Sequence, residues 1–194
     1  MLSREEFDAL EFGAARTGDH RAAAVRMNEL ADACQAGELS RAEAYLRAGE
    51  QWLLADDPQA AADGFRRALA DGDGTFMDAR VSLARALFQL GNANEARELI
   101  SQLESQGRRD PRQCDLVAEL LVEQSDLIGA LDWANTGVEL CLGQDGGRLD
   151  DSAPPQVPPD ADKTELRLLL SLRYRIRNDM GLSEDGYDKL LDVL

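Results

Sequence analysis

The stretch AEAYLRAGEQWLLADDPQAAADGFRRALADGDG, residues 42–74, decides the fold of this 194-residue chain. Its small and bulky apolar residues form two groups, each spaced as on one face of an α-helix. The groups consist of Tyr45, Gly49 and Trp52, and of Ala61, Phe65 and Ala68. Between them, Asp57-Pro58 supplies an N-cap and a proline at the first helical position. The stretch therefore predicts two helices joined by a turn.

The same template recurs along the chain. Ala61, Ala96 and Ala130 mark equivalent small positions, which are 35 and 34 residues apart. A weaker copy opens the chain around Phe7, Ala14 and Ala23, and a degenerate copy closes it, fitting loosely at Leu170, Tyr174, Gly181, Tyr187 and Leu190. Self-similarity at a fixed period of this length indicates a stack of helical repeats.

The pattern resembles the tetratricopeptide repeat (TPR), whose period is about 34 residues. The resemblance implies an all-α fold, a right-handed α-solenoid of antiparallel helix pairs with about four repeats and a C-terminal capping helix pair. We expect the repeats at about residues 4–37, 42–74, 77–110 and 111–144, and a degenerate repeat or capping helices of the same domain at 163–194.

Local signals agree with these boundaries. Capping boxes are expected at Ser3, Ser40 and Thr75, and Asp110-Pro111 starts the fourth copy. Residues 145–162 hold four prolines, two glycines and five acidic residues, and predict a flexible or polyproline-like loop. A partner-binding proline motif is the alternative, although no convincing PxxP with flanking arginine occurs.

Composition narrows the function. The net charge of −16 disfavours binding to nucleic acids and anionic membranes, and suits a basic partner or solubility alone. No apolar run approaches the length of a transmembrane helix, and no signal peptide is visible. Cys34, Cys114 and Cys141 lack CxxC spacing, which favours buried reduced thiols in a cytoplasmic protein.

Residues for catalysis are scarce. His20 is the single histidine and is expected in a solvent-facing turn. Asp71-Gly72-Asp73-Gly74 does not fit the spacing of a calcium loop, and phosphate-binding and nucleophile-elbow motifs are absent. We therefore predict a protein that is not an enzyme and that has no metal site and no cofactor.

The resemblance also implies a ligand groove lined by the first helix of each repeat. The family's groove positions, transferred one by one, are Glu5, Asp8, Phe12, Glu43, Leu46, Glu50, Leu53, Asp78, Val81, Arg85, Phe88, Arg112, Asp115, Glu119 and Val122. Acidic residues are the largest group in this groove, with apolar positions and two arginines among them, and the family's chaperone-binding clamp of Lys, Asn and Arg is missing. The expected partner is a protein or peptide segment of basic or mixed basic and apolar character.

Two further readings stay open. Arg167, Arg173, Arg175 and Arg177 concentrate positive charge on one helix, and are expected to pair inside the molecule, with a contact site as the alternative. The apolar end at Leu190, Leu191, Val193 and Leu194 favours a structural module that forms homo-oligomers as a second candidate function. A sensor domain of a larger regulator is a third, weaker one.

Overall fold

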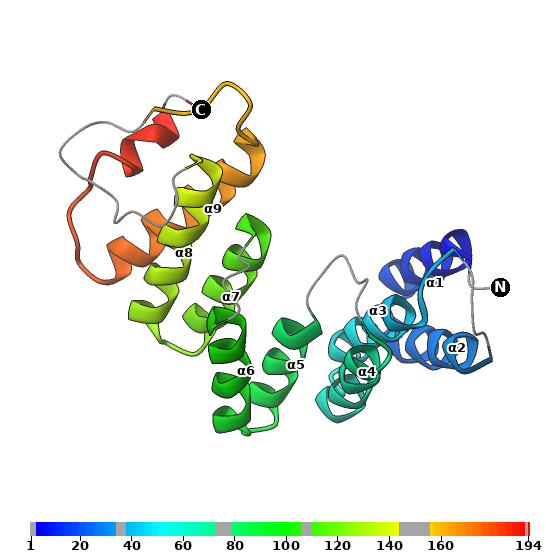
Figure 1. Cartoon of the computed structure of the whole chain (residues 1–194). Coiled ribbons are helices and arrows are strands. Elements are labelled where there is room, and N and C mark those ends of the chain that lie inside the picture. The colour runs from blue at the N-terminus through cyan, green and yellow to red at the C-terminus, as the bar shows by residue number, and fades with distance from the viewer. Residues whose placement is uncertain (1–2, 34–37, 73–78, 106–109, 144–155, 193) are drawn as a thin grey trace. The chain divides into compact units, whose positions relative to one another are not determined.

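The computed structural model describes residues 3–33, 38–72, 79–105, 110–143, 156–192 and 194. Over these residues the chain forms nine α-helices and one 3-10 turn, and no strand (Figure 1). It divides into two compact units, Met1–Ser105 and Gln106–Leu194. The all-α prediction is confirmed. The capping box expected at Thr75 and most of the loop expected at 145–162 lie outside the described residues.

The first unit contains three successive helix pairs. They are α1 (Arg4–Thr17) with α2 (His20–Ala33), α3 (Arg41–Leu54) with α4 (Pro58–Ala70), and α5 (Ala79–Gln89) with α6 (Ala93–Ser105). Helix α2 also packs on α3, and α4 packs on α5, so each pair is stacked on the next. This is the arrangement of a TPR-like solenoid, and it confirms the predicted fold class.

Close approach within the α3–α4 pair depends on two glycines. A Cβ atom added at Gly49 would lie 2.4 Å from Cε1 of Phe65, which is fully buried. A Cβ atom at Gly64 would lie 3.4 Å from the Cα atom of Gly49. Gly49 and Gly64 therefore let the two helices approach closely, and Gly64 is a contact point that the repeat template did not indicate. Tyr45 and Trp52 are bulky residues of the same helix and are also buried.

Most of the predicted helix starts are confirmed. Oγ of Ser40 accepts a hydrogen bond from the backbone N–H of Glu43 at 3.0 Å. Oδ1 of Asp57 and Oδ1 of Asp110 cap α4 and the helix that begins at Pro111 in the same way. Ser3 is the exception, because it precedes α1 in extended conformation but its side chain makes no capping hydrogen bond. The capping box predicted at Ser3 is therefore wrong.

The turns within the helix pairs repeat a left-handed backbone conformation. Asp56, Gly91 and Ser125 occupy equivalent positions and have φ values of 56°, 77° and 61°. A left-handed φ costs an L-residue about 1–2 kcal/mol, and glycine avoids that cost. The repeat turn therefore tolerates residues other than glycine, which is why glycine alone did not mark it in the sequence.

The second unit contains one full pair and a third helix. Helix α7 (Pro111–Glu123) pairs with α8 (Leu127–Cys141), and α9 (Lys163–Asp179) packs on both. A Cβ atom added at Gly137 of α8 would lie 2.6 Å from Cδ2 of Leu169 and 2.9 Å from Cβ of Cys114. Gly137 thus lets α8 approach α7 and α9 together.

The expected second capping helix is replaced by a short turn. After α9 the described chain forms only the 3-10 turn η1 (Asp188–Asp192), which packs on α9. Tyr187 and Leu190 are buried there, in agreement with their apolar role in the degenerate copy. The closing copy therefore has one helix of a pair and a short segment in place of the other.

Two arginines of α9 hold this terminal segment. The side chain of Arg173 is 2% exposed and donates from Nε to Oδ1 of Asn135 at 2.7 Å and from Nη1 to Oδ1 of Asp185 at 3.0 Å. It also pairs with Asp188, whose Oδ2 accepts from Nε of Arg177 at 3.0 Å. The predicted internal pairing is confirmed for Arg173 and Arg177. Their partners lie downstream of α9, in the terminal segment.

Candidate functional site on the first helices

In the first unit, Arg47 of α3 links α3 to α1. Its Nε and Nη2 atoms both lie 2.7 Å from the carboxylate oxygens of Glu11, in a two-point ion pair. Nη2 also donates to Oδ1 of Asp8, and the guanidinium lies 5.5 Å from the ring centroid of Phe7. The side chain of Arg47 is 13% exposed. Arg47 therefore compensates part of the acidic charge on α1.

Glu50, one turn further along α3, is in a different electrostatic situation. Burial raises its pKa to about 7, and the nearby charge of Glu11 adds to the rise, while Arg47 and Arg85 oppose it. Burial and like charge both disfavour an ionised carboxylate. Glu50 is thus a carboxyl group at which the acidic charge of this face is not fully compensated, even with two arginines nearby.

The other predicted groove residues of the first unit differ in exposure. Phe12 is 71% exposed on α1, where it offers an apolar contact. Glu5 and Asp8 are exposed, and Glu43 is half-buried and pairs with Arg4 at 3.3 Å. Leu46, which is 4% exposed, and Val81 are buried, so they support this face from beneath instead of contacting a ligand.

Helix α5 contributes less open surface than the template implies. Arg85 and Phe88 are half-buried, and the guanidinium of Arg97 on α6 lies 5.9 Å from the centroid of the Phe88 ring. Asp78 falls outside the described residues. The exposed apolar contacts of the first unit's helices α1 and α3 are therefore Phe12 and, at the end of α3, Leu54, which is 61% exposed.

In the second unit, the predicted residues of α7 meet α9. Burial raises the pKa of Asp115 to about 6, with further contributions from the charges of Glu119 and Glu165, and Arg175 acts in the opposite direction. Arg112 lies 3.9 Å from Glu165. The structure therefore places Asp115 and Glu119 in an acidic group that also includes a residue of α9.

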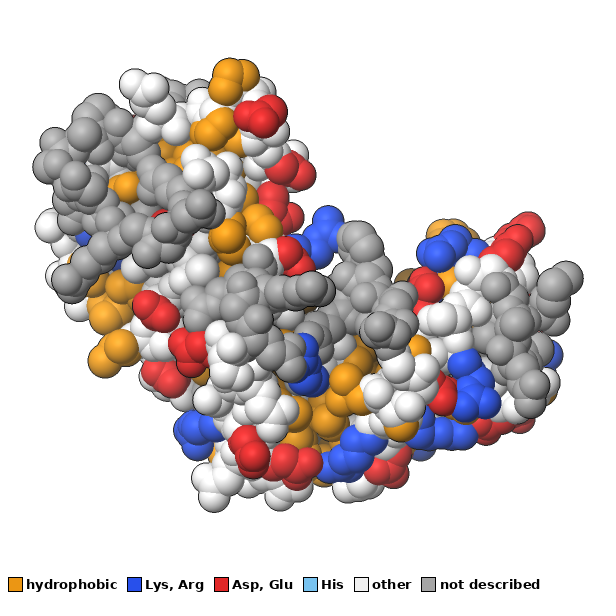
Figure 2. Space-filling model, viewed as in Figure 1, with side chains coloured by type: hydrophobic (Ala, Val, Ile, Leu, Met, Phe, Trp, Pro, Cys, Tyr) orange, Lys and Arg blue, Asp and Glu red, His pale blue; other side chains and the backbone are white. Residues whose placement is uncertain are grey.

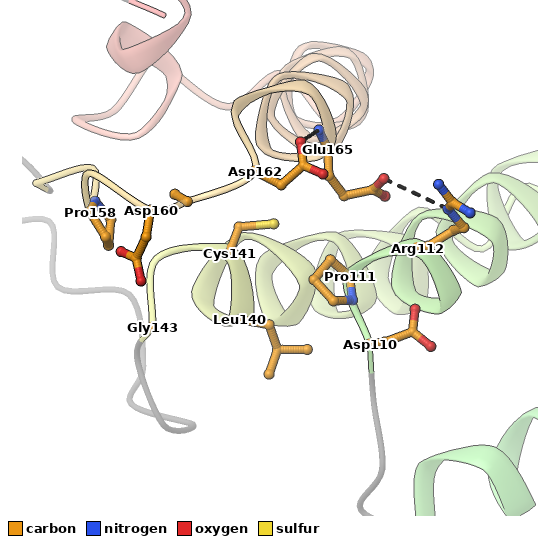
Figure 3. Close-up of a pocket in the computed structure, with 11 residues that line it drawn as sticks. Asp110, Pro111, Arg112, Leu140, Cys141, Gly143, Pro158, Asp160, Asp162 and Glu165 are labelled. Atoms are coloured by element: carbon orange, nitrogen blue, oxygen red, sulfur yellow. Dashed lines mark hydrogen bonds and ion pairs between the residues drawn. The ribbon is translucent and has the colours of Figure 1, made fainter.

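A cleft of about 490 Å³ lies where the start of α7, the end of α8 and the start of α9 meet. Figure 3 shows Cys141, Asp110, Asp162 and Glu165 among the residues that line this cleft. Two of these carboxylates already have structural roles, because Asp110 caps α7, and Asp162 caps α9 by accepting from the backbone N–H groups of Thr164 and Glu165. This cleft is formed largely by helix ends.

The thiol in this cleft is not activated. Burial raises the pKa of Cys141 to about 11, and the charges of Glu165 and Asp162 add to the rise. A nucleophilic cysteine requires the opposite shift. Cys114 is buried, and Cys34 lies outside the described residues. Among the residues that the structure describes, no group of three His, Cys, Asp or Glu side chains is arranged to hold a metal ion.

His20 has a structural contact that the sequence did not suggest. It begins α2, is half-buried, and its Nδ1 atom lies 2.9 Å from Oε1 of Gln51 on α3. The expectation of a solvent-facing turn residue is therefore wrong. Similarly, Asp71, considered for a calcium loop, accepts a hydrogen bond from Nε of Arg41 at 2.6 Å.

The surface carries both acidic and basic side chains, although the net charge is −16. Figure 2 shows acidic and basic side chains interspersed on the face in view. Many ion pairs join residues about one repeat apart, as do Arg21 with Asp57 and Arg47 with Glu11. Opposite charges at the repeat spacing are the sequence signal that could have identified Glu11 and Arg47, which the family's groove positions omit.

One known protein family matches part of the chain. Residues 53–120, from the end of α3 into α7, match the tetratricopeptide repeat model. This match confirms the predicted resemblance to the tetratricopeptide repeat over these residues. No curated protein and no solved structure matches the chain. Repeats of this family generally mediate protein–protein interactions and are generally not enzymes.

Within the described part of the chain, no helix combines the length and the apolar character that crossing a membrane requires.

Proposed function

We propose that this chain is a non-enzymatic adaptor or regulatory protein, which binds a basic or mixed basic and apolar segment of another protein on the acidic faces of its first helices. The proposal includes a cytoplasmic location, which rests on the cysteine pattern. It needs neither a cofactor nor a metal ion.

The observation that carries the proposal is the crowding of carboxyl groups on first helices in both units. Glu50 on α3 lies near Glu11, and Asp115 on α7 lies near Glu119 and Glu165. In each place burial and neighbouring charge favour the protonated form, although arginines are nearby. A cationic side chain bound beside such a carboxyl group would stabilise its ionised form, and this complementarity favours a lysine- or arginine-containing partner.

Apolar contacts support the same proposal. Phe12 is highly exposed on α1, on the same helix as Asp8 and Glu11. An exposed aromatic ring next to acidic side chains suits a segment in which basic and apolar residues alternate. By contrast, Leu190 at the C-terminal end is buried, which removes one of the residues expected to form an apolar end for homo-oligomers.

Isothermal titration calorimetry of the full chain with pools of basic and acidic peptides tests this proposal. We expect heat of binding from basic peptides that contain leucine or phenylalanine, and weaker binding as salt increases, because added ions screen exposed charges. The proposal would be contradicted if the chain bound the acidic pool in preference to the basic pool and if this preference were lost when Glu50 and Glu119 are replaced.

A further inference from the structure

The exposed face of α9 differs in charge from the rest of this acidic chain. It presents three cations and one carboxylate, together with two large side chains that are partly open to solvent. These residues are Lys163, Arg167, Leu168, Tyr174, Arg175 and Asp179. Leu168 is 53% exposed and Tyr174 is 42% exposed, while the opposite side of the helix is buried. We call this surface the α9 face.

Among the described residues, the cations of the α9 face differ from several arginines elsewhere in the chain. In the first unit, several exposed arginines pair with carboxylates of other helices, for example Arg66 with Glu95 at 3.2 Å. Within α9, Arg173 and Arg177 pair with Asp185 and Asp188. Over the described ranges of the chain, however, neither Lys163 nor Arg167 nor Arg175 forms an ion pair.

The absence of pairing is informative because acidic side chains are abundant. The chain has 37 Asp and Glu residues against 21 Lys and Arg residues. Asp115 lies close enough to Arg175 for the arginine to act on its pKa, but the two do not form an ion pair. Cations combined with exposed Leu168 and Tyr174 have the composition of a protein-binding surface, where arginine and tyrosine are enriched.

We infer that the α9 face binds a second kind of partner, an acidic protein segment that carries Asp or Glu together with leucine or an aromatic residue. Arg167 and Arg175 can each bind a carboxylate through two parallel hydrogen bonds. Leu168 and Tyr174 supply the apolar contact beside them. A nucleic acid is a poor occupant, because the net charge of −16 repels a phosphate backbone.

This inference does not rest on the proposed function, since it concerns the cations of α9 and a partner of opposite charge, although Arg175 lies near Asp115 of the proposed acidic face. If both hold, the chain joins a basic segment and an acidic segment, as an adaptor would. Either one can fail while the other stands, because the two use separate peptides and separate substitutions.

The test uses the full chain and fluorescein-labelled peptides followed by fluorescence anisotropy. The first peptide alternates Glu and Leu, the second replaces Glu by Lys, and the third replaces Leu by Ser. We expect the first peptide to bind, and the third to bind more weakly. The double variant Arg167→Glu with Arg175→Glu should weaken binding of the first peptide at least tenfold, or about 1.4 kcal/mol.

The matched control makes the same change of charge on the first unit, with Arg66→Glu and Arg97→Glu on the exposed sides of α4 and α6. The control should bind the first peptide within about twofold of the unmodified chain, since exposed charges outside the α9 face are largely screened by salt. Circular dichroism checks that both double variants are folded. Equal losses in the two variants, or no binding of the first peptide to the unmodified chain, would overturn the inference.

The remaining candidate for a partner of the α9 face is a second copy of this acidic chain, and sedimentation velocity tests for such self-association. Under our inference the α9 variant leaves the association state unchanged. A dimer that forms with increasing concentration and that is lost in the Arg167→Glu, Arg175→Glu variant, without binding of the acidic peptide, would assign the α9 face to self-association and overturn the inference.

Discussion

The two units of this protein use the same repeat but end differently. Each helix pair of the first unit is stacked on the next, so α2 and α4 pack on the following pair. In the second unit α9 packs as the first helix of another pair, but a short segment with the 3-10 turn η1 takes the place of its partner. The first unit depends on small residues between helices, and the second depends in addition on a buried ionic cluster.

The difference shows two ways of covering the end of a helical repeat. A second helix covers its partner with apolar side chains such as Phe65, which is fully buried. A short segment has fewer apolar residues, and here charged groups occupy the interior position, with Arg173 2% exposed and Asp188 1% exposed. Removing one member of a buried ion pair is costly because its partner remains charged in a poorly solvated place.

The largest expected effect is the loss of the second unit's end on replacing Arg173 by Met. Asp185 and Asp188 would lose their shared cation, and breaking a buried pair costs roughly 3–5 kcal/mol. We expect faster hydrogen exchange in α9 and η1, measured by mass spectrometry, and no change in α3. The exposed Arg175→Met variant is the control, with an effect within about 0.5 kcal/mol.

The same cluster should respond to acid. Burial raises the pKa of Asp185, but hydrogen bonds from Arg173 and from the backbone of Asp188 outweigh this, so the pKa is lowered overall. A carboxyl group with a lowered pKa stabilises the fold at neutral pH, and that contribution is lost as pH falls through its folded-state pKa. Exchange in α9 that is unchanged by the Arg173→Met substitution would contradict the role of this cluster.

The second prediction concerns helix contact in the first unit. Gly49→Ala places a Cβ atom against the ring of Phe65 and should destabilise the unit by about 1–3 kcal/mol, as overpacking does. Gly13→Ala is the control, because beyond the neighbouring residues and backbone of α1 itself no atom lies within 4 Å of the added Cβ. That variant should be about 0.5–1 kcal/mol more stable, as expected when alanine replaces glycine inside a helix. Urea denaturation measures both; equal effects would show that the contact at Gly49 is unimportant.

These effects show why much of the fold could be predicted from the sequence. Gly49, Ala61 and Phe65 stand at fixed positions of a template of about 34 residues, and Ala61, Ala96 and Ala130 are fully buried at its equivalent positions. Caps such as Ser40 and Asp57 involve only residues that are close in sequence, so they could also be predicted. The end of the second unit could not be predicted, because Arg173 meets Asp185 and Asp188 through a chain path that no repeat describes.

The candidate site was predicted less completely. The groove positions transferred from the TPR family included Glu50, Asp115 and Phe12 as candidates. The exposure of a side chain depends on packing, however, so the template could not distinguish buried Leu46 from exposed Phe12. Arg47 lies outside the transferred positions, although its ion pairs with Asp8 and Glu11 set the charge of this face. The helices that a charged side chain connects are set by the tertiary structure. The sequence indicates them only through the spacing of opposite charges about one repeat apart.

A smaller effect on stability is expected when one carboxyl group is neutralised on the acidic face of either unit. The pKa of Glu50 is raised from 4.5 to about 7, so its ionisation destabilises the fold, and this cost grows as pH rises from about 4.5 to about 7. Glu50→Gln should therefore raise the unfolding temperature at pH 8 and leave it nearly unchanged at pH 4.5, with a gain on the order of 1 kcal/mol. Asp115→Asn should act with the same sign in the second unit.

Thermal unfolding at the two pH values checks this prediction, with Glu98→Gln on the exposed side of α6 as the control. The control should show no difference between pH 4.5 and pH 8 beyond that of the unmodified chain. A gain for Glu50→Gln that is the same at both pH values would show that the substitution acts through packing and not through charge.

The most direct test of the central claim is calorimetric titration of one basic peptide, alternating Lys and Leu, into matched charge variants of the full chain. The double variant Glu50→Gln with Glu119→Gln removes carboxylates from first helices, and Glu29→Gln with Glu98→Gln removes the same charge from the exposed sides of second helices. We predict that the first variant binds the peptide at least tenfold more weakly than the unmodified chain, and that the second binds within about twofold. Equal affinity of both variants for the peptide would contradict a binding site on the first helices.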